Sequence, residues 1–123
     1  MGKEGFKGLK VWQKSKELAV QVYRITDHGV LKNDYGLRDQ IRRSSVSIPS
    51  NIAEGDERDT DKEAVRHFYI AKGSAAELLT QLIIAREIGY IDEPTFIGLE
   101  EKCIEVSSML SKLISARSKT FSR

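Results

Sequence analysis

The chain has 123 residues, of which 40% are hydrophobic and 31% are charged, and its formal net charge at pH 7 is +2. This length suits one hydrophobic core, so we expect a single domain over residues 1–123, with its core at about residues 8–117 and basic, flexible ends. No apolar run approaches the roughly 20 residues that cross a bilayer, and no secretory signal is visible, so we expect a cytoplasmic protein without a membrane partner.

The first two predicted helices follow from apolar periodicity and from their terminal residues. The first covers residues 9–26, where apolar side chains recur at helical spacing, and it ends near Gly29. The second begins at Asn33 or Asp34, because either side chain can cap a helix, and it runs to Gly55. Both helices present one apolar stripe, which indicates packing against a common core.

Residues 41–55, IRRSSVSIPSNIAEG, are the most informative part of the second helix. The isoleucines of this segment fall on one helical stripe, although Pro49 interrupts the pattern. Pro49 has no amide hydrogen to donate to the carbonyl of Ser45, so we expect a bend there. Nearby hydroxyl groups can take over the freed backbone groups. A segment with these features is typical of a helix that packs in one specific arrangement.

The last two predicted helices carry clear start signals. Thr60 and Glu63 form a capping box that opens the third helix, which closes at Gly89. Asp92 caps the fourth, whose apolar stripe continues through Leu113. At roughly 27 and 26 residues, each would be about 40 Å long. No segment has the pattern of a strand, and the connections are short. The sequence therefore predicts an all-α fold, an antiparallel up-down-up-down four-helix bundle.

The second half of the third helix is apolar around more than one stripe, which exceeds what one intramolecular face needs. Its first half is rich in alanine, glycine and serine, which permit close backbone approach. We therefore expect self-association through Leu79, Ile83, Ile84 and Ile88. The alternative is that Ile83 and Ile84 are individually exposed residues.

The sequence gives no support for catalysis. Di-iron bundles need Glu-x-x-His pairs, and the chain has none. Glu63 and His67 stand four residues apart and could share a metal, but a surface ion pair is the simpler interpretation. Cys103 is expected to be a core thiol, and the acidic run 54–61 is interpreted as a helix end, a turn and an N-cap. We predict a non-enzymatic protein without catalytic, cofactor or metal residues.

Positive charge is concentrated at both ends of the chain. Residues 1–16 and 106–123 each have a net charge of +4, which leaves −6 for the middle. If the two ends lie together, they form a patch suited to phosphates, although such charges also serve solubility and helix C-termini. The candidate phosphate contacts, which would not read bases, are Lys7, Lys10, Lys14, Arg38, Arg42 and Lys119.

The arginines of the second helix also have structural interpretations. Asp39 can neutralise Arg42 or Arg43, and Arg43 can instead pair with Glu77, for which partial burial is plausible. We favour structural roles for these arginines over ligand contact. The residues interpreted as structural are Trp12, Arg43, Pro49, Asn51, Glu54 and Glu77.

Four motifs carry a family resemblance: VWQ at 11–13, YGL at 35–37, QIRRSSVSIPSNIAEG at 40–55 and IAKGSAAELLTQL at 70–82. Together they resemble the four-helix bundle family of proteins encoded in intervening sequences of bacterial large-subunit ribosomal RNA genes. That family includes the accessory variability determinants of diversity-generating retroelements. The resemblance implies a bundle that assembles into a homopentameric ring. In the retroelement branch it implies contact with nucleic acid and a reverse transcriptase, and it implies no catalytic residues or cofactors.

Two departures from the family pattern affect the interpretation. HGV at 28–30 stands where many members have Phe-Pro, and the net charge of +2 is modest beside the basic retroelement members. Five copies in a ring would still concentrate their basic ends on one surface. We predict a ring-forming scaffold or accessory protein that associates with RNA or DNA. The alternative is a protein-interaction module that binds no nucleic acid.

Overall fold

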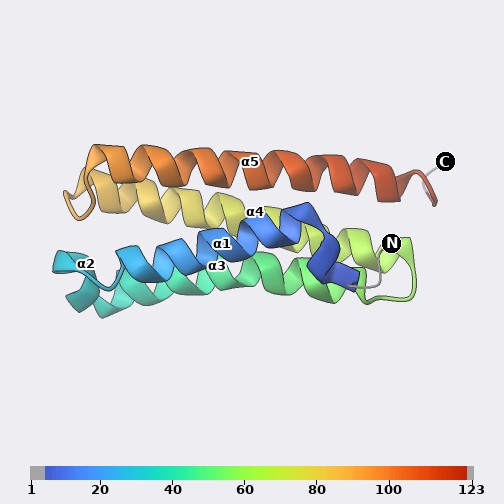
Figure 1. Ribbon diagram of the computed structural model, residues 1–123, viewed down its shortest axis with the longest axis horizontal. Helices are drawn as coiled ribbons and strands as arrows, with labels where there is room; N and C mark the ends of the chain where they lie inside the picture. The colour runs from blue at the N-terminus through green and yellow to red at the C-terminus, as the bar shows by residue number, and fades with distance from the viewer. Residues whose placement is uncertain (1–4, 122–123) are drawn as a thin grey trace.

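The structure, a computed structural model, describes residues 5–121, and all its regular elements are helical (Figure 1). The elements are the 3-10 helix η1 (Gly5–Gly8) and the α-helices α1 (Lys10–Ile25), α2 (Gly29–Asn33), α3 (Tyr35–Asp56), α4 (Asp61–Glu87) and α5 (Glu93–Ser118). Successive long helices alternate in direction, and α1 packs against both α3 and α5 (Figure 1). The predicted antiparallel four-helix bundle is confirmed.

Side chains cap the N-termini of α3, α4 and α5, as the sequence predicts. Their oxygens accept hydrogen bonds from backbone amides in the first turn: Asp34 from Leu37 at 3.1 Å, Thr60 from Glu63 at 3.2 Å and Asp92 from Thr95 at 2.9 Å. Each bond satisfies an amide that has no partner within its helix. Of the two residues expected to cap α3, the structure uses Asp34, because Asn33 still belongs to α2.

The short helix α2 has no counterpart in the sequence prediction, which placed a simple connection before α3. Gly29 opens it with a φ of +61°, a conformation that residues with a Cβ rarely adopt. Within α2, Leu31 turns inward and is 1% exposed. One buried leucine in a helix of five residues produces no periodic pattern, so sequence periodicity could not reveal this turn.

The core is one continuous cluster of buried side chains between the long helices, closed at one end by Leu31. Phe68 of α4 is the largest fully buried side chain, and the isoleucine stripe of α3 is fully buried around it. The predicted apolar stripe of α3 is therefore the face that packs inward. The larger residues of the cluster that are essentially inaccessible are Leu18, Leu31, Ile41, Ile48, Ile52, Phe68, Leu78, Leu82, Leu99 and Leu110.

Helix α3 continues through Pro49, which is buried within it. The hydroxyl group of Ser45 donates to the carbonyl of Arg42 at 2.8 Å, one turn before the proline. Asn51, after the proline, donates to the carbonyl of Ser47 at 2.9 Å. Side chains on both sides of Pro49 thus bond to the backbone of the same helix, in keeping with the many hydroxyl and amide groups of this segment.

The two basic segments lie toward the same end of the bundle. Figure 1 shows η1 and the start of α1 on the side where α5 finishes and where α3 turns into α4. A Cβ built on Gly5 would lie 3.7 Å from a carboxylate oxygen of Glu57, so η1 is close to that turn. The tertiary structure therefore brings the basic ends beside the acidic segment 54–61. Among the described helices, none combines the length and the apolar character that a membrane span requires.

Candidate nucleic-acid interface

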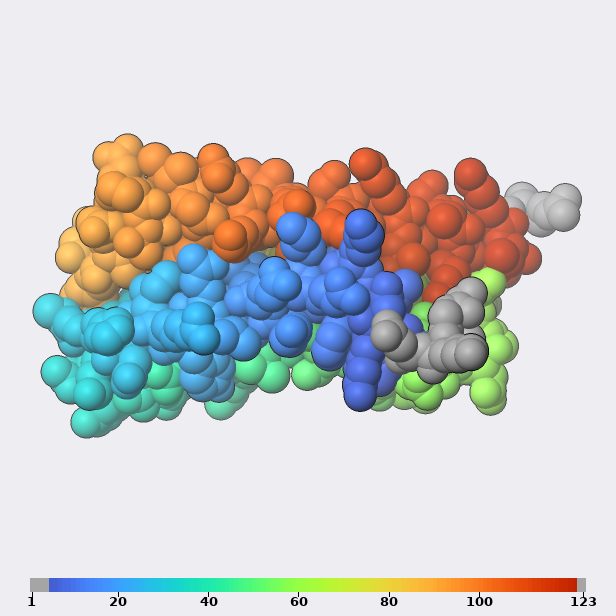
Figure 2. Space-filling model, viewed as in Figure 1, coloured from blue at the N-terminus to red at the C-terminus, as the bar shows by residue number. Residues whose placement is uncertain are grey.

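Four of the six candidate phosphate contacts lie between the middle of the bundle, where Lys14 stands opposite Glu105 of α5, and the end at which α5 finishes. Lys7 lies in η1, Lys10 and Lys14 lie in the first two turns of α1, and Lys119 follows α5 directly. All four side chains are exposed, and the surface in Figure 2 shows the start of α1 open to solvent on this face. We call these four lysines the basic end. Lys3, which the charge pattern also includes, lies outside the described residues.

Within residues 5–121, only Lys14 of the basic end has an acidic partner. Its Nζ lies 3.8 Å from Oε2 of Glu105, and both side chains are about half exposed, at 48% and 49%. An exposed ion pair of this length contributes little to stability and does not hold the lysine in place. The ammonium groups of the basic end are therefore available for phosphate oxygens.

Arg38 and Arg42 belong to the opposite end of the bundle, where α3 begins. The Nε of Arg42 donates to Oγ1 of Thr26 at 2.8 Å, and its guanidinium lies 4.5 Å from the ring centroid of Tyr23. Thr26 is buried, and its hydroxyl group donates to the carbonyl of Val22 at 2.8 Å. Arg42 thereby fastens the end of α1 to α3, which supports its structural interpretation.

Arg38 has a similar set of partners. It pairs with Asp39 at 3.0 Å, donates to the carbonyl of Lys32 at 3.0 Å, and lies over the ring of Tyr35. The expectation that Asp39 neutralises Arg42 or Arg43 is wrong: among the described residues Asp39 pairs with Arg38, while the guanidinium of Arg42 is held by Thr26 and Tyr23. Arg38 holds α2 against α3 in this arrangement.

The acidic turn beside the basic end is partly neutralised by Arg117. Its guanidinium donates to Asp56 at 2.8 Å and to Asp61 at 3.1 Å, and it lies 5.5 Å from the ring centroid of Phe68. The side chain of Asp56 is only 7% exposed. The turn between α3 and α4 is thus a helix end followed by an N-cap, as predicted. Within residues 5–121, no three His, Cys, Asp or Glu side chains are grouped as a metal site would require.

The hydroxyl-rich segment of α3 meets α4 in a row of side-chain contacts that we call the polar seam. Ser44 donates to Glu77 at 3.4 Å, and the hydroxyl groups of Ser47 and Ser74 lie 2.8 Å apart. The next contact along the seam joins Oδ1 of Asn51 to Nδ1 of His67 at 3.2 Å. Asn51 also donates to the hydroxyl group of Ser47 at 3.1 Å, which links two contacts of the seam.

The polar seam explains why the segment combines isoleucines with hydroxyl groups. The isoleucines point into the core, while Ser44, Ser47 and Asn51 face α4 along its flank. Because each polar group must find its own partner, the seam specifies the register of α3 against α4 more narrowly than apolar packing alone. Ser74 and His67 are the partners that sequence reasoning missed. Seven residues separate them on α4, whereas Ser47 and Asn51 are four residues apart on α3, so no matching spacing in the sequence identified them.

Three expectations about this region need correction. Glu77 is exposed rather than partly buried, and Arg43 shares a surface pocket with it without forming an ion pair among the described residues. His67 turns toward α3, where its Nε2 lies 4.0 Å from Glu54, and forms no ion pair with Glu63. The interhelical contact wins because Asn51 stands opposite His67 at hydrogen-bonding distance, whereas Glu63 is free to point into solvent.

The remaining structural residues are placed as follows. Trp12 packs against the core and meets Phe6 edge to face, with ring centroids 5.2 Å apart. Glu54 accepts from Arg58 at 2.8 Å one turn later in the chain. Cys103 is buried, and burial, with a smaller contribution from Glu100, raises the pKa of its thiol to about 12. A neutral, buried thiol confirms the prediction of a core cysteine.

The residues expected at an oligomer interface lie along the outer side of α4. Ile83, Ile84 and Ile88 are 38%, 47% and 52% exposed, whereas Leu79 is partly buried and packs against the core. Large apolar side chains on neighbouring parts of α5, among them Ile97 and Ile104, are also exposed. Self-association through this surface stays a prediction, and it would remove the isoleucines from water.

Comparison with known proteins bears on the fold and on the family. A crystal structure of a protein with unknown function from the S23 ribosomal protein family of Bacteroides thetaiotaomicron VPI-5482 is similar, with 24% identity and a TM-score of 0.78. The similarity covers 85% of this chain and 97% of that one, and it shows the fold. No curated protein matches the chain. The model of the 23S rRNA-intervening sequence protein family matches residues 7–112. The chain therefore belongs to the 23S rRNA-intervening sequence protein family.

Proposed function

We propose that the protein is a non-enzymatic, oligomeric scaffold or accessory protein that associates with RNA or DNA through phosphate contacts. The observation that carries the proposal is the basic end, where Lys7, Lys10 and Lys119 are exposed and have no acidic partner within residues 5–121. Ammonium groups on flexible stems neutralise backbone phosphates without reading sequence. Arg38 and Arg42 are left out of the proposed contact surface, because their guanidinium groups already bond to the protein.

Assembly strengthens the proposed contact. One subunit offers few phosphate contacts, and its net charge is only +2. In a homopentameric ring, the form that the family resemblance implies, each basic end is repeated by symmetry, so that weak contacts add along one nucleic-acid strand. The exposed isoleucines of α4 are the proposed subunit contact. A reverse transcriptase is a further proposed partner if the protein belongs to the retroelement branch.

A specific observation also favours the rival function, a protein-interaction module that ignores nucleic acid. The acidic segment 54–61 lies toward the same end of the bundle as the basic end, and only part of it is neutralised by Arg117. The remaining carboxylates repel phosphates. They therefore weaken the attraction between phosphates and the few lysines of one subunit. Polar and charged residues make up the rim of protein–protein contacts, so a surface of mixed charge suits such a contact.

A salt titration separates the two functions. Fluorescence anisotropy would follow a labelled single-stranded RNA and a labelled DNA duplex at increasing salt concentrations. The proposal expects binding that weakens steeply with salt, and a Lys7→Gln/Lys10→Gln double variant whose log K against log salt slope is shallower by about 2. The matched control is Lys32→Gln/Lys102→Gln, which removes equal charge away from the basic end. Absence of binding at low salt would establish the rival function instead.

A further inference from the structure

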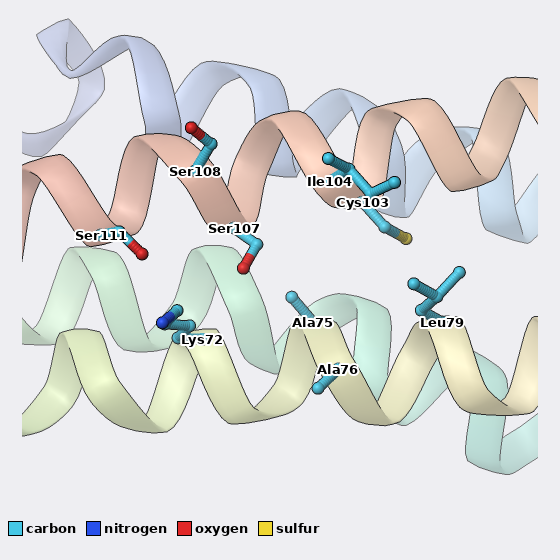
Figure 3. A pocket seen from close by; sticks show the side chains of 9 residues that line it. All are labelled: Lys72, Ala75, Ala76, Leu79, Cys103, Ile104, Ser107, Ser108 and Ser111. Carbon is cyan, nitrogen blue, oxygen red and sulfur yellow. The ribbon is translucent and has the colours of Figure 1, made fainter.

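The surface between α4 and α5 is hollowed into a groove made of two adjoining pockets. One has a volume of about 370 Å³ and the other about 400 Å³, and Lys72 and Ser111 line both, so the two pockets adjoin at these residues. Volumes of this size are typical of small-molecule sites. Figure 3 shows the hydroxyl groups of Ser107 and Ser111 on the side of α5 that faces α4, and Lys72 on the side of α4 that faces α5. We call this surface the α4–α5 groove.

One half of the groove is cationic and rich in hydroxyl groups. Lys72 is partly buried, and no acidic side chain lines either pocket. Its neighbours one turn away along α4 are Phe68, Tyr69, Ala75 and Ala76, and α5 has no acid after Glu105. Within the described residues, Lys72 therefore has a positive charge without a counter-ion. The hydroxyl groups beside it belong to Tyr69, Ser107, Ser111, Ser115 and Ser118.

An ammonium group in a pocket that hydroxyl groups also line matches an oxyanion. A carboxylate or phosphate accepts charge-assisted hydrogen bonds from the lysine and further bonds from the serines. Partial burial of Lys72 strengthens this attraction, because the ammonium group is screened less by water than an exposed one. The alternative is that Lys72 has only a packing role, in which its methylene groups cover the core. That role would not require hydroxyl groups in the same pocket. The groove offers both charge and directional donors.

The other half of the groove is apolar. Ala75, Ala76, Leu79 and Ile104 line it, and the sulfur of Cys103 points toward α4 from α5 (Figure 3). Small alanine side chains open this half, while Leu79 and Ile104 form its walls. Along α4, the distance from Lys72 to Leu79 corresponds to a rise of about 10 Å. The groove can therefore cover a short alkyl chain that extends from an anion held at Lys72.

We propose that the α4–α5 groove binds a small anionic amphiphile, which consists of an oxyanion head, carboxylate or phosphate, and a short apolar body. The head contacts Lys72, Ser107 and Ser111, and the body lies against Ala76, Leu79 and Ile104. This site is independent of the basic end, because its residues belong to α4 and α5 and none of them is among the proposed nucleic-acid contacts. Occupation of the groove buries apolar surface that the isolated subunit leaves in contact with water.

The test uses octanoate and octyl phosphate as probes in an amide NMR titration of the full chain. Both probes are expected to cause saturable shifts at Lys72, Ser107 and Ser111, and 1-octanol is expected to bind at least about tenfold more weakly. A preference for octyl phosphate or for octanoate identifies the head group. Lys72→Met keeps the apolar stem and is expected to lose about tenfold or more in affinity. The control Lys102→Met, on α5 outside the groove, retains binding.

A second variant tests the apolar half. Ala76 is exposed, so Ala76→Phe is tolerated by the fold and places a ring across the groove. Octanoate binding is expected to fall about tenfold, whereas shifts caused by inorganic phosphate near Lys72 persist. Equal affinity of the parent protein and Lys72→Met, or absence of saturable shifts, would overturn the proposal. The proposal would also be overturned if the protein were an oligomer that binds no probe and light scattering showed that Lys72→Met, but not the control variant, dissociates it. A second copy of the chain would then occupy the groove.

Discussion

Gly55 of α3 lies directly against Phe68 of α4. A Cβ built on Gly55 would come within 2.9 Å of Phe68 Cε1, a distance that real contacts do not show. It would also lie 2.9 Å from the Cβ of His67 and 3.0 Å from the carbonyl oxygen of Ala64. The close crossing of the two helices at this point therefore depends on glycine, and it places His67 where it reaches the polar seam.

The substitution Gly55→Ala is expected to destabilise the protein by about 1–3 kcal/mol, because the new methyl group must displace the Phe68 ring or separate α3 from α4. Urea denaturation followed by circular dichroism measures the change. Gly73→Ala is the matched control, because nothing lies within 4 Å of its Cβ position. It is expected to stabilise α4 by about 0.5–1 kcal/mol. Equal effects of the two substitutions would contradict the close approach at Gly55.

The polar seam makes a prediction about coupling between α3 and α4. Ser47→Ala leaves Ser74 without its partner and removes an acceptor for Asn51, so we expect a loss of about 1–2 kcal/mol. In the double variant Ser47→Ala/Ser74→Ala, the substitution of Ser74 should lower the free energy of unfolding by less than it does alone. A double-mutant cycle followed by urea denaturation measures this difference. Ser50→Ala, on the exposed side of the same helix, should change stability by less than about 0.5 kcal/mol. Strict additivity of Ser47 and Ser74 would show that the seam is not energetically linked.

Arg117 ties the end of α5 to the turn between α3 and α4. Arg117→Met removes both hydrogen bonds and leaves the nearly inaccessible Asp56 carboxylate unpaired, which is expected to cost about 2–4 kcal/mol in chemical denaturation. Adding Asp56→Asn removes the unpaired charge and should restore part of that loss. The exposed pair of Arg58 and Glu54 provides the comparison, and Arg58→Met should cost less than about 1 kcal/mol.

The buried thiol of Cys103 predicts a stability change at alkaline pH. Burial raises the pKa of the folded thiol to about 12 from its ordinary value of 9.0, so above pH 9 the unfolded chain loses this proton first. The unfolded state then binds fewer protons than the folded state, and the free energy of unfolding falls as the pH rises from 9 toward 12. The upper limit of the slope is about 1.4 kcal/mol per pH unit.

Denaturation of the parent protein and of Cys103→Ala between these pH values checks the prediction. The variant is less stable at neutral pH because it loses buried volume, but the difference between the two proteins should narrow as the pH rises. All other ionisable groups are the same in both proteins, so their contributions cancel in the comparison. A constant difference across the alkaline range would show that the thiol titrates normally in the folded protein.

Local signals in the sequence determined most of the helices. Asp34, Thr60 and Asp92 each bond to an amide three residues further along the chain, and such short-range contacts are visible in a pattern of residues. Apolar periodicity likewise identified the buried faces of the long helices. Apolar periodicity did not predict helix α2, because only one of its residues, a leucine, is buried.

The site residues were decided by contacts between distant parts of the chain. Arg42 reaches Thr26, Asp56 reaches Arg117, and His67 reaches Asn51 only after the helices have packed. The sequence shows which residues are charged, but it does not show their hydrogen-bond or ion-pair partners, because each flexible side chain has several acceptors within reach. Helix packing chose among them. It also created the α4–α5 groove, since the residues that line it become neighbours only when α5 lies along α4.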